Sequence, residues 1–301
     1  MPISLNVRVY HFTGLQHFSG AFPPAKGKDD LLGQQLQSPL PIRYFWRAMI
    51  ANMDAWVRSN VSPPNSSYPK IANGTLILLE KYAMPEIPGV NRPHEASEGT
   101  RLDFGPNWRN GIFSVQPPKV GKPFPVLVPQ VDVDGNERAG VRLPAISVPL
   151  ATYTSWNLRD PSIGAPDQRV AFEGSYIPFP KTTADRKNAH DPRKSIAERY
   201  VSRQDYLDRY THALDELVKQ HWILEEDRAQ LLHYGEQDWD EVMKQRNGSR
   251  GADKPKLLEP RARPGARDIS PLPLIRPRAH ASRSRCPPHR KRESQRPCKN
   301  G

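Results

Sequence analysis

Two histidines in a setting that could support catalysis occur near the start of the sequence, in VRVYHFTGLQHFSG at positions 7–20. β-Branched and aromatic residues fill positions 7–13 and stop at Gly14, which predicts a buried strand followed by a glycine turn. His17 then stands in a loop of small and polar residues, a setting that suits a general base. An ordinary surface histidine would fit the same pattern. His11 is the rival, but its place inside the predicted strand favours a hydrogen-bonded core residue.

A histidine base of this kind needs a nucleophile to act on. The motif G-x-S-x-G, which places a serine on a sharp turn between a strand and a helix, occurs nowhere in the 301 residues. Ser4 is the only serine before His17, and no glycine turn accompanies it. The sequence therefore marks no serine nucleophile for this histidine through that motif.

Metal and cofactor chemistry has little support in the sequence. The pattern D-x-D-G-N at 132–136 resembles the start of a calcium loop. No glutamate follows at the twelfth position, so a plain turn is the stronger interpretation. The remaining histidines lack the paired spacing of zinc ligands, and the only two cysteines are Cys286 and Cys298. We expect no metal and no cofactor.

Charge separates the chain into a neutral body and a basic tail. Residues 246–301 hold 16 basic and 4 acidic residues, so the net charge of +12 lies in this tail. The tail is rich in Arg, Pro and Ser without a periodic apolar face, so we expect it to be disordered. It would contact nucleic acid only non-specifically, through phosphates. No apolar run could span a bilayer and no secretion signal is present, so we expect a cytoplasmic protein without membrane contact.

Helical patterns lie at both ends of the body. Residues 41–58 carry one apolar stripe that predicts a core-packed helix, formed by Ile42, Phe45, Trp46, Met49, Ile50, Met53, Trp56 and Val57. Ser195-x-x-Glu198 and Ser202-x-x-Asp205 predict two capped helix starts. Between these regions, residues 59–125 predict a loop-rich extension. Residues 126–150 predict a β-hairpin around the turn at 134–136.

The histidine segment, the first helix and several later stretches together resemble one known family. The most specific stretches are VPQVDVDGNERAGVRLP at 128–144 and PLATYTSWN at 149–157. Over residues 5–245 the chain resembles the C-terminal half of a large bacterial family of alpha/beta hydrolase domain proteins. That family is distantly similar to tannase and feruloyl esterases. Ser155 departs from the glycine that the family usually has before Trp156.

The resemblance implies an α/β fold in the form of a truncated α/β-hydrolase. Residues 1–60 would supply the last strand and last helix of the hydrolase core. Residues 61–245 would form a family-specific extension with the hairpin and the C-terminal helices, and residues 246–301 the disordered tail. The parent enzyme would hydrolyse a small-molecule carboxylic ester, with His17 as its catalytic base, and this chain alone would be inactive. The alternative is a non-catalytic binding module whose basic tail contacts nucleic acid or another polyanion.

Overall fold

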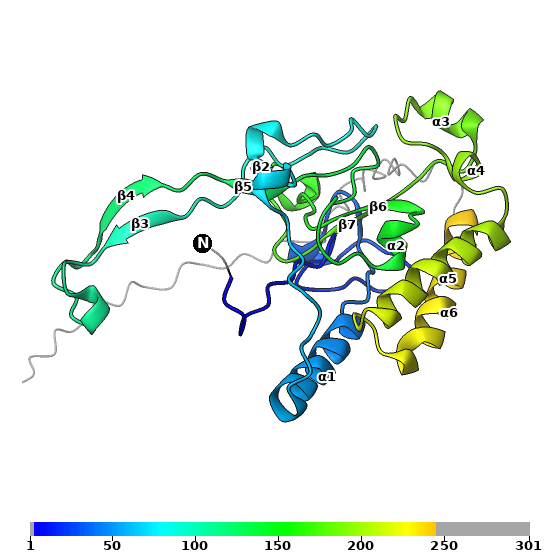
Figure 1. Ribbon diagram of the computed structural model, residues 1–301. Coiled ribbons are helices and arrows are strands. Elements are labelled where there is room, and N and C mark those ends of the chain that lie inside the picture. Colours follow the sequence, from blue (N-terminus) through cyan, green and yellow to red (C-terminus); the bar gives the residue numbers. More distant parts are fainter. Residues whose placement is uncertain (1–2, 245–301) are drawn as a thin grey trace, which may run out of the picture. The chain divides into compact units, whose positions relative to one another are not determined.

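The structure is a computed structural model of the chain, and it describes residues 3–244 (Figure 1). The predictions made for the tail at 246–301, its disorder and its contact with nucleic acid among them, lie outside the described residues. Among residues 3–244, no helix is long and apolar enough to cross a membrane.

The strands of the described chain are short and pair in three separate antiparallel sheets. The largest sheet has the order β1-β7-β6, and the others are the pairs β2-β5 and β3-β4. The strands are β1 (Leu36–Gln37), β2 (Leu76–Leu78), β3 (Thr100–Asp103), β4 (Lys119–Pro123), β5 (Leu127–Pro129), β6 (Ala151–Thr154) and β7 (Ser175–Pro178).

The α-helices lie mainly at the C-terminal end of the body. They are α1 (Arg43–Ser59), α2 (Pro144–Ser147), α3 (Thr183–Ala189), α4 (Ile196–Arg199), α5 (Arg203–Lys219) and α6 (Arg228–Lys244). Short 3₁₀ turns also occur at Asp29–Leu31, Ile71–Asn73, Leu79–Lys81, Trp108–Asn110, Pro161–Ile163 and Glu225–Asp227. This mixture of helices with small sheets agrees with the predicted α/β class.

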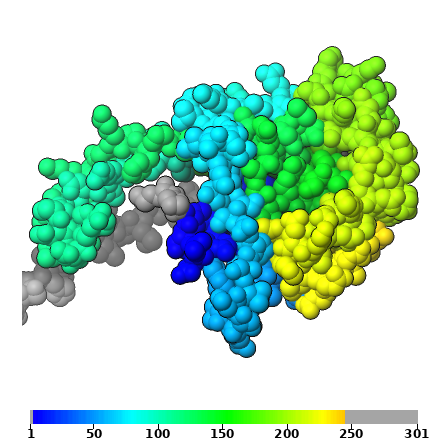
Figure 2. Space-filling view, viewed as in Figure 1, coloured from blue at the N-terminus to red at the C-terminus, as the bar shows by residue number. Residues whose placement is uncertain are grey.

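The main core lies between the β6-β7 pair and the helices α2, α5 and α6. Tyr153 of β6 and Tyr176 of β7 are paired in register and fully buried, with ring centroids 5.4 Å apart. Leu214 of α5 and Leu231 of α6 are buried in the same cluster. Figure 2 shows the yellow surface of α6 directly beside the green surface of the sheet region. Burying these side chains contributes roughly 1.5–3 kcal/mol each.

The start of α5 follows the local pattern seen in the sequence. Ser202 is the N-cap, and its hydroxyl accepts a hydrogen bond of 3.1 Å from the backbone N–H of Asp205. Ser195 is the N-cap of α4, and the carboxylate of Glu198 accepts hydrogen bonds from its backbone N–H at 2.8 Å and from its hydroxyl at 2.6 Å. Both predicted helix starts are therefore confirmed, because a cap is formed by residues only three apart.

Residues 7–13 do not form the continuous strand that the sequence predicted. Tyr10 and Phe12 each make a single parallel bridge, to Ser67 and Val141. The rings of Tyr10 and Phe12 pack on the main core, whereas Val9 remains 40% exposed. The prediction of a buried strand is wrong for this segment, since each of the two neighbouring segments forms a bridge with it at one residue pair only.

The helix at 41–58 is confirmed as α1, but the prediction that its whole apolar stripe is core-packed is wrong. Tyr44, Phe45 and Ala48 are the residues of α1 that are buried. One side of the stripe is exposed along the length of the helix and consists of Trp46, Ile50, Met53 and Val57. Figure 2 shows much of the surface of α1 uncovered within the described chain. Helical periodicity identified the apolar face of α1, but how much of that face is buried depends on which other elements pack against it.

The predicted hairpin at 126–150 is replaced by a tight turn between separate elements. β5 pairs with β2 in place of a later strand, and residues 144–147 form α2. The turn itself is present: Val131 and Glu137 form an antiparallel bridge around it. Gly135 has a φ of +80°, a left-handed conformation that glycine adopts without strain.

The pair β3-β4 lies apart from the main core. Every residue of these two strands is exposed, and Figure 1 shows the pair standing apart from the other strands. Exposed aromatic side chains, Trp108, Phe113 and Phe124 among them, accompany it. An isolated two-stranded ribbon has little stability of its own in water.

Candidate functional site

His17 is exposed on a loop whose neighbouring residues are firmly held. On one side, the side chain of Gln16 is buried and its Nε2 donates to the carbonyl of Ser38 at 3.0 Å. On the other side, the hydroxyl of Ser19 donates to the carbonyl of Leu40 at 2.8 Å. The backbone is thus fixed on both sides while the imidazole remains accessible.

Two aromatic rings flank the His17 imidazole. The ring centroids of Phe18 and Phe172 lie 4.7 and 4.9 Å from that of His17. Phe172 has a φ of +62°, a strained conformation for a bulky residue, and its carbonyl accepts from the N–H of Phe18 at 3.2 Å. Among residues 3–244, no side chain forms a hydrogen bond with the His17 ring. Within residues 3–244, His17 therefore has no serine or acid as a hydrogen-bond partner.

His11, the rival histidine, does have an acidic partner. Its Nε2 lies 2.7 Å from Oε2 of Glu137, a residue that is only 6% exposed. The same carboxylate oxygen accepts the backbone N–H of Gly14 at 2.9 Å. Gly14 has a φ of +63°, and a Cβ there would lie 3.1 Å from Cδ1 of Ile146, so glycine fits this close approach. Glu137 thus joins His11 to the loop that precedes His17.

Sequence reasoning did not identify Glu137. The one available signal was its position immediately after the turn at 132–136, where the chain reverses against Val131. Local patterning predicts such a turn. It does not show that the carboxylate of Glu137 contacts His11 and Gly14. These two residues precede Glu137 in the chain by 126 and 123 positions. That contact depends on tertiary packing alone.

The D-x-D-G-N pattern forms a turn, as the sequence favoured. Oδ1 of Asp132 accepts the backbone N–H groups of Asp134 and Asn136, both at 3.0 Å. Burial raises the pKa of the Asp132 carboxyl above its usual value. In the described part of the chain, no three histidine, cysteine or acidic residues are grouped so that they could hold a metal ion.

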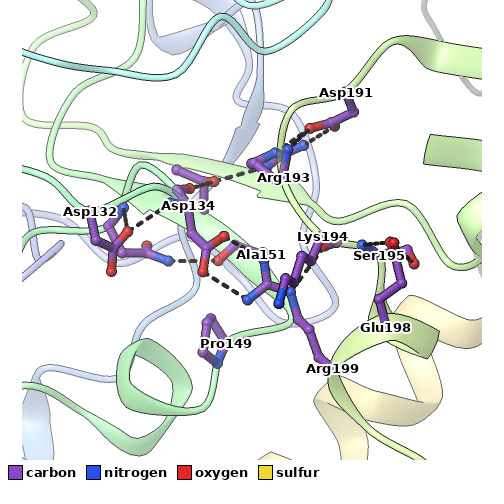
Figure 3. Close-up of polar contacts among 12 residues, drawn as sticks. Asp132, Asp134, Pro149, Ala151, Asp191, Arg193, Lys194, Ser195, Glu198 and Arg199 are labelled. Atoms are coloured by element: carbon purple, nitrogen blue, oxygen red, sulfur yellow. Dashed lines mark hydrogen bonds and ion pairs between the residues drawn. The ribbon is translucent and has the colours of Figure 1, made fainter. Parts of the chain in front are cut away.

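A charged network joins this turn to α4 and to the segment before it (Figure 3). Asp134 receives two hydrogen bonds from the guanidinium of Arg199, one of them 2.8 Å long. Farther along, Arg193 is 2% exposed and forms an ion pair of 2.7 Å with Asp191. Arg193 also donates to the Thr152 hydroxyl at 2.9 Å. Each charge in this network has a charged partner, which indicates a structural role.

Comparison with known proteins gives one clear result. A model of the alpha/beta hydrolase domain family matches residues 2–233. No curated protein and no solved structure matches the chain. The match spans His11, His17 and Glu137, as well as the α5 helix and the central sheet.

Proposed function

Since the chain belongs to the alpha/beta hydrolase domain family, we propose that it is part of a hydrolase of carboxylic esters and supplies the catalytic base, His17. The observation that supports this assignment is the exposed imidazole on a loop held on both sides by Gln16 and Ser19. A general base has to reach a reacting group without reorganising its own backbone.

The chemistry would follow the serine-hydrolase sequence of steps. The imidazole of His17 takes the proton of a serine hydroxyl as the serine oxygen attacks the ester carbonyl, and a tetrahedral intermediate forms. His17 then gives that proton to the alcohol oxygen as its bond to the carbonyl carbon breaks, which leaves the acyl-serine. Water hydrolyses the acyl-serine with His17 again acting as base. This sequence contains no G-x-S-x-G, so the serine would come from a polypeptide segment beyond it, and the chain alone would be inactive.

His11 is the second candidate for the same role, favoured by its contact with Glu137. A carboxylate that holds an imidazole orients the ring and stabilises its protonated form, which is what an acid partner does in a catalytic triad. However, Glu137 is buried and its side chain also fixes the Gly14 N–H, so the pair equally serves to anchor the loop.

Variants of the two histidines test the assignment. The chain alone should show no turnover of p-nitrophenyl acetate. Joined to the polypeptide encoded immediately upstream of its gene, if that segment carries a G-x-S-x-G, it should become active. His17→Ala in the joined protein should lower kcat/KM by a factor of roughly 10²–10⁴.

His11→Ala is the matched control and should affect kcat/KM much less. The reverse pattern would transfer the role to His11. Turnover by the chain alone that survives His17→Ala would refute the proposal.

A further inference from the structure

A cavity of about 130 Å³ is lined by Glu137 and not by His11. Its walls come from residues 79–82, 93–96, 128–137 and 153–156 and from Arg169. The two stretches at 128–144 and 149–157 thus meet at one small chamber. A larger hollow of about 870 Å³ shares Tyr82 and Glu95 with the chamber, so the two spaces adjoin. The chamber has room for a chemical group, and the hollow for the rest of a molecule.

The carboxylate of Glu137 in the chamber wall lacks a permanently charged partner among residues 3–244. Oε2 meets the His11 imidazole and the Gly14 N–H, and Oε1 is 3.4 Å from the hydroxyl of Ser155. A buried carboxylate whose partners carry no permanent charge is poorly compensated, because burial removes the water that would otherwise solvate it. A cation entering the chamber would supply the missing charge.

Two aromatic side chains complete the chamber. Tyr82 and Trp156 line it and pack against the small apolar cluster of Met84, Ile87, Val131 and Ile177. The Trp156 side chain is hydrogen-bonded to Tyr82, and burial raises the pKa of the Tyr82 hydroxyl to about 12, so this wall is neutral. The faces of tyrosine and tryptophan rings attract cations, most strongly when water is excluded.

The outer hollow carries more negative than positive charge. Glu80, Glu95 and Glu98 line it, against the single guanidinium of Arg92. Arg169, which lines the inner chamber, is exposed and donates to the hydroxyl of Ser97 at 3.0 Å. Neither arginine forms an ion pair with Glu137. The approach to the chamber therefore favours a positively charged molecule.

We propose that this chamber binds a small organic cation, with Glu137 as its counter-ion and Tyr82 and Trp156 as its aromatic walls. A trimethylammonium or alkylammonium group suits both the volume and the wall chemistry. The proposal is independent of ester hydrolysis, since it concerns binding to this chain and needs no nucleophile.

Choline and 3,3-dimethylbutan-1-ol form a matched pair of probes, because they share shape but only choline is charged. Each would be titrated into the full chain by calorimetry, with tryptophan fluorescence as the second readout. Choline should bind at least about tenfold more tightly than the neutral alcohol, a difference of about 1.4 kcal/mol. Choline should also change the fluorescence of the wild type and leave that of Trp156→Phe nearly unchanged.

Glu137→Gln should weaken choline binding by about tenfold or more. Glu173→Gln is the control, since Glu173 is also buried, at 4% exposure, but does not line the chamber. If Glu137→Gln fails to fold, Trp156→Leu replaces it, because that change leaves the contacts of Glu137 with His11 and Gly14 in place. It should weaken choline binding several-fold.

Three results would overturn the proposal. They are equal affinity for the charged and neutral probes, undiminished choline binding by the chamber variants, and no choline binding by the wild type. Binding of acetate in place of choline would assign the chamber to anions through Arg169 and would equally overturn it.

Discussion

The two faces of the β6-β7 pair each hold a buried carboxyl group, and the partners of these two groups differ. Side chains alternate along a strand, so Tyr153 and Tyr176 point to the helices while Thr152 and Ile177 point to the opposite side. On the helix face, the carboxyl of Asp238 in α6 is fully buried. On the opposite face, Asp191 is buried beside Arg193. One fold thus holds one acid among phenols and another beside a guanidinium.

The phenolic environment shifts the proton equilibrium of Asp238. Its carboxyl accepts hydrogen bonds from the hydroxyls of Tyr153 at 3.0 Å and Tyr176 at 3.4 Å. Burial outweighs these bonds and raises the pKa of Asp238 to about 7. At Asp238 the two phenol hydroxyls therefore do not hold the pKa near its usual value, whereas the guanidinium of Arg193 offers Asp191 a full opposite charge.

Removing the guanidinium of Arg193 should have the largest effect on the free energy of unfolding. Arg193→Met leaves Asp191 buried and unpaired, so the free energy of unfolding should fall by about 3–5 kcal/mol. Urea unfolding of the chain measures this loss. Adding Asp191→Asn to Arg193→Met should recover part of it, because no buried charge then remains unpaired.

The control is Arg203→Met. Arg203 forms a comparable ion pair of 3.1 Å with Asp240, but both side chains are more than 40% exposed. Its removal should change the free energy of unfolding by less than about 1 kcal/mol. Equal losses for the buried and the exposed arginine would show that the Asp191–Arg193 pair has no special role.

The tyrosine-lined face should make stability depend on pH. The pKa of Asp238 in the folded chain, about 7, is higher than the pKa of about 3.9 for an unfolded aspartate, so folding favours the protonated form. The contribution of Asp238 is therefore complete below about pH 4 and is lost as the pH rises to about 7. Asp238→Asn lacks this titration. The free energy of unfolding of Asp238→Asn, relative to that of the wild type, should therefore rise between pH 5 and pH 8. Urea unfolding of both proteins at pH 5 and at pH 8 measures this difference.

Asp240→Asn provides the control on the same helix, at a residue that is far more exposed. Its difference from the wild type should vary little over the same pH range. A difference for Asp238→Asn that stays constant between pH 5 and pH 8 would mean that Asp238 does not hold a proton in the folded chain.

The smallest expected effect comes from a substitution that touches neither buried acid. Ser202→Ala removes the hydroxyl that caps α5, and the free energy of unfolding should fall by about 1 kcal/mol. Ser59→Ala, at an exposed serine in the last turn of α1, should change it by less than about 0.5 kcal/mol. A loss at Ser202 as large as that at Arg193 would indicate that helix capping, and not burial of charge, dominates this fold.

Structural features that depend only on residues close together in the sequence were predictable from it. Ser202 and Asp205 define the start of α5, and Gly135 defines a turn, because a cap or a turn closes over three or four residues. The family was also identifiable from residues, and the match over 2–233 confirms it. The role of His17 and the domain boundaries at 60 and 245 remain predictions.

Contacts between residues that are far apart in the sequence could be seen only in the tertiary structure. Periodicity marked Trp46 and Met53 of α1 as apolar but not as exposed, because burial depends on elements elsewhere in the chain. No local pattern indicated that Glu137 would reach His11, or that Asp238 would lie against Tyr153. These contacts join residues that are far apart along the chain. Their charge and proton affinity are set by burial and partners, which exist only after the fold has formed.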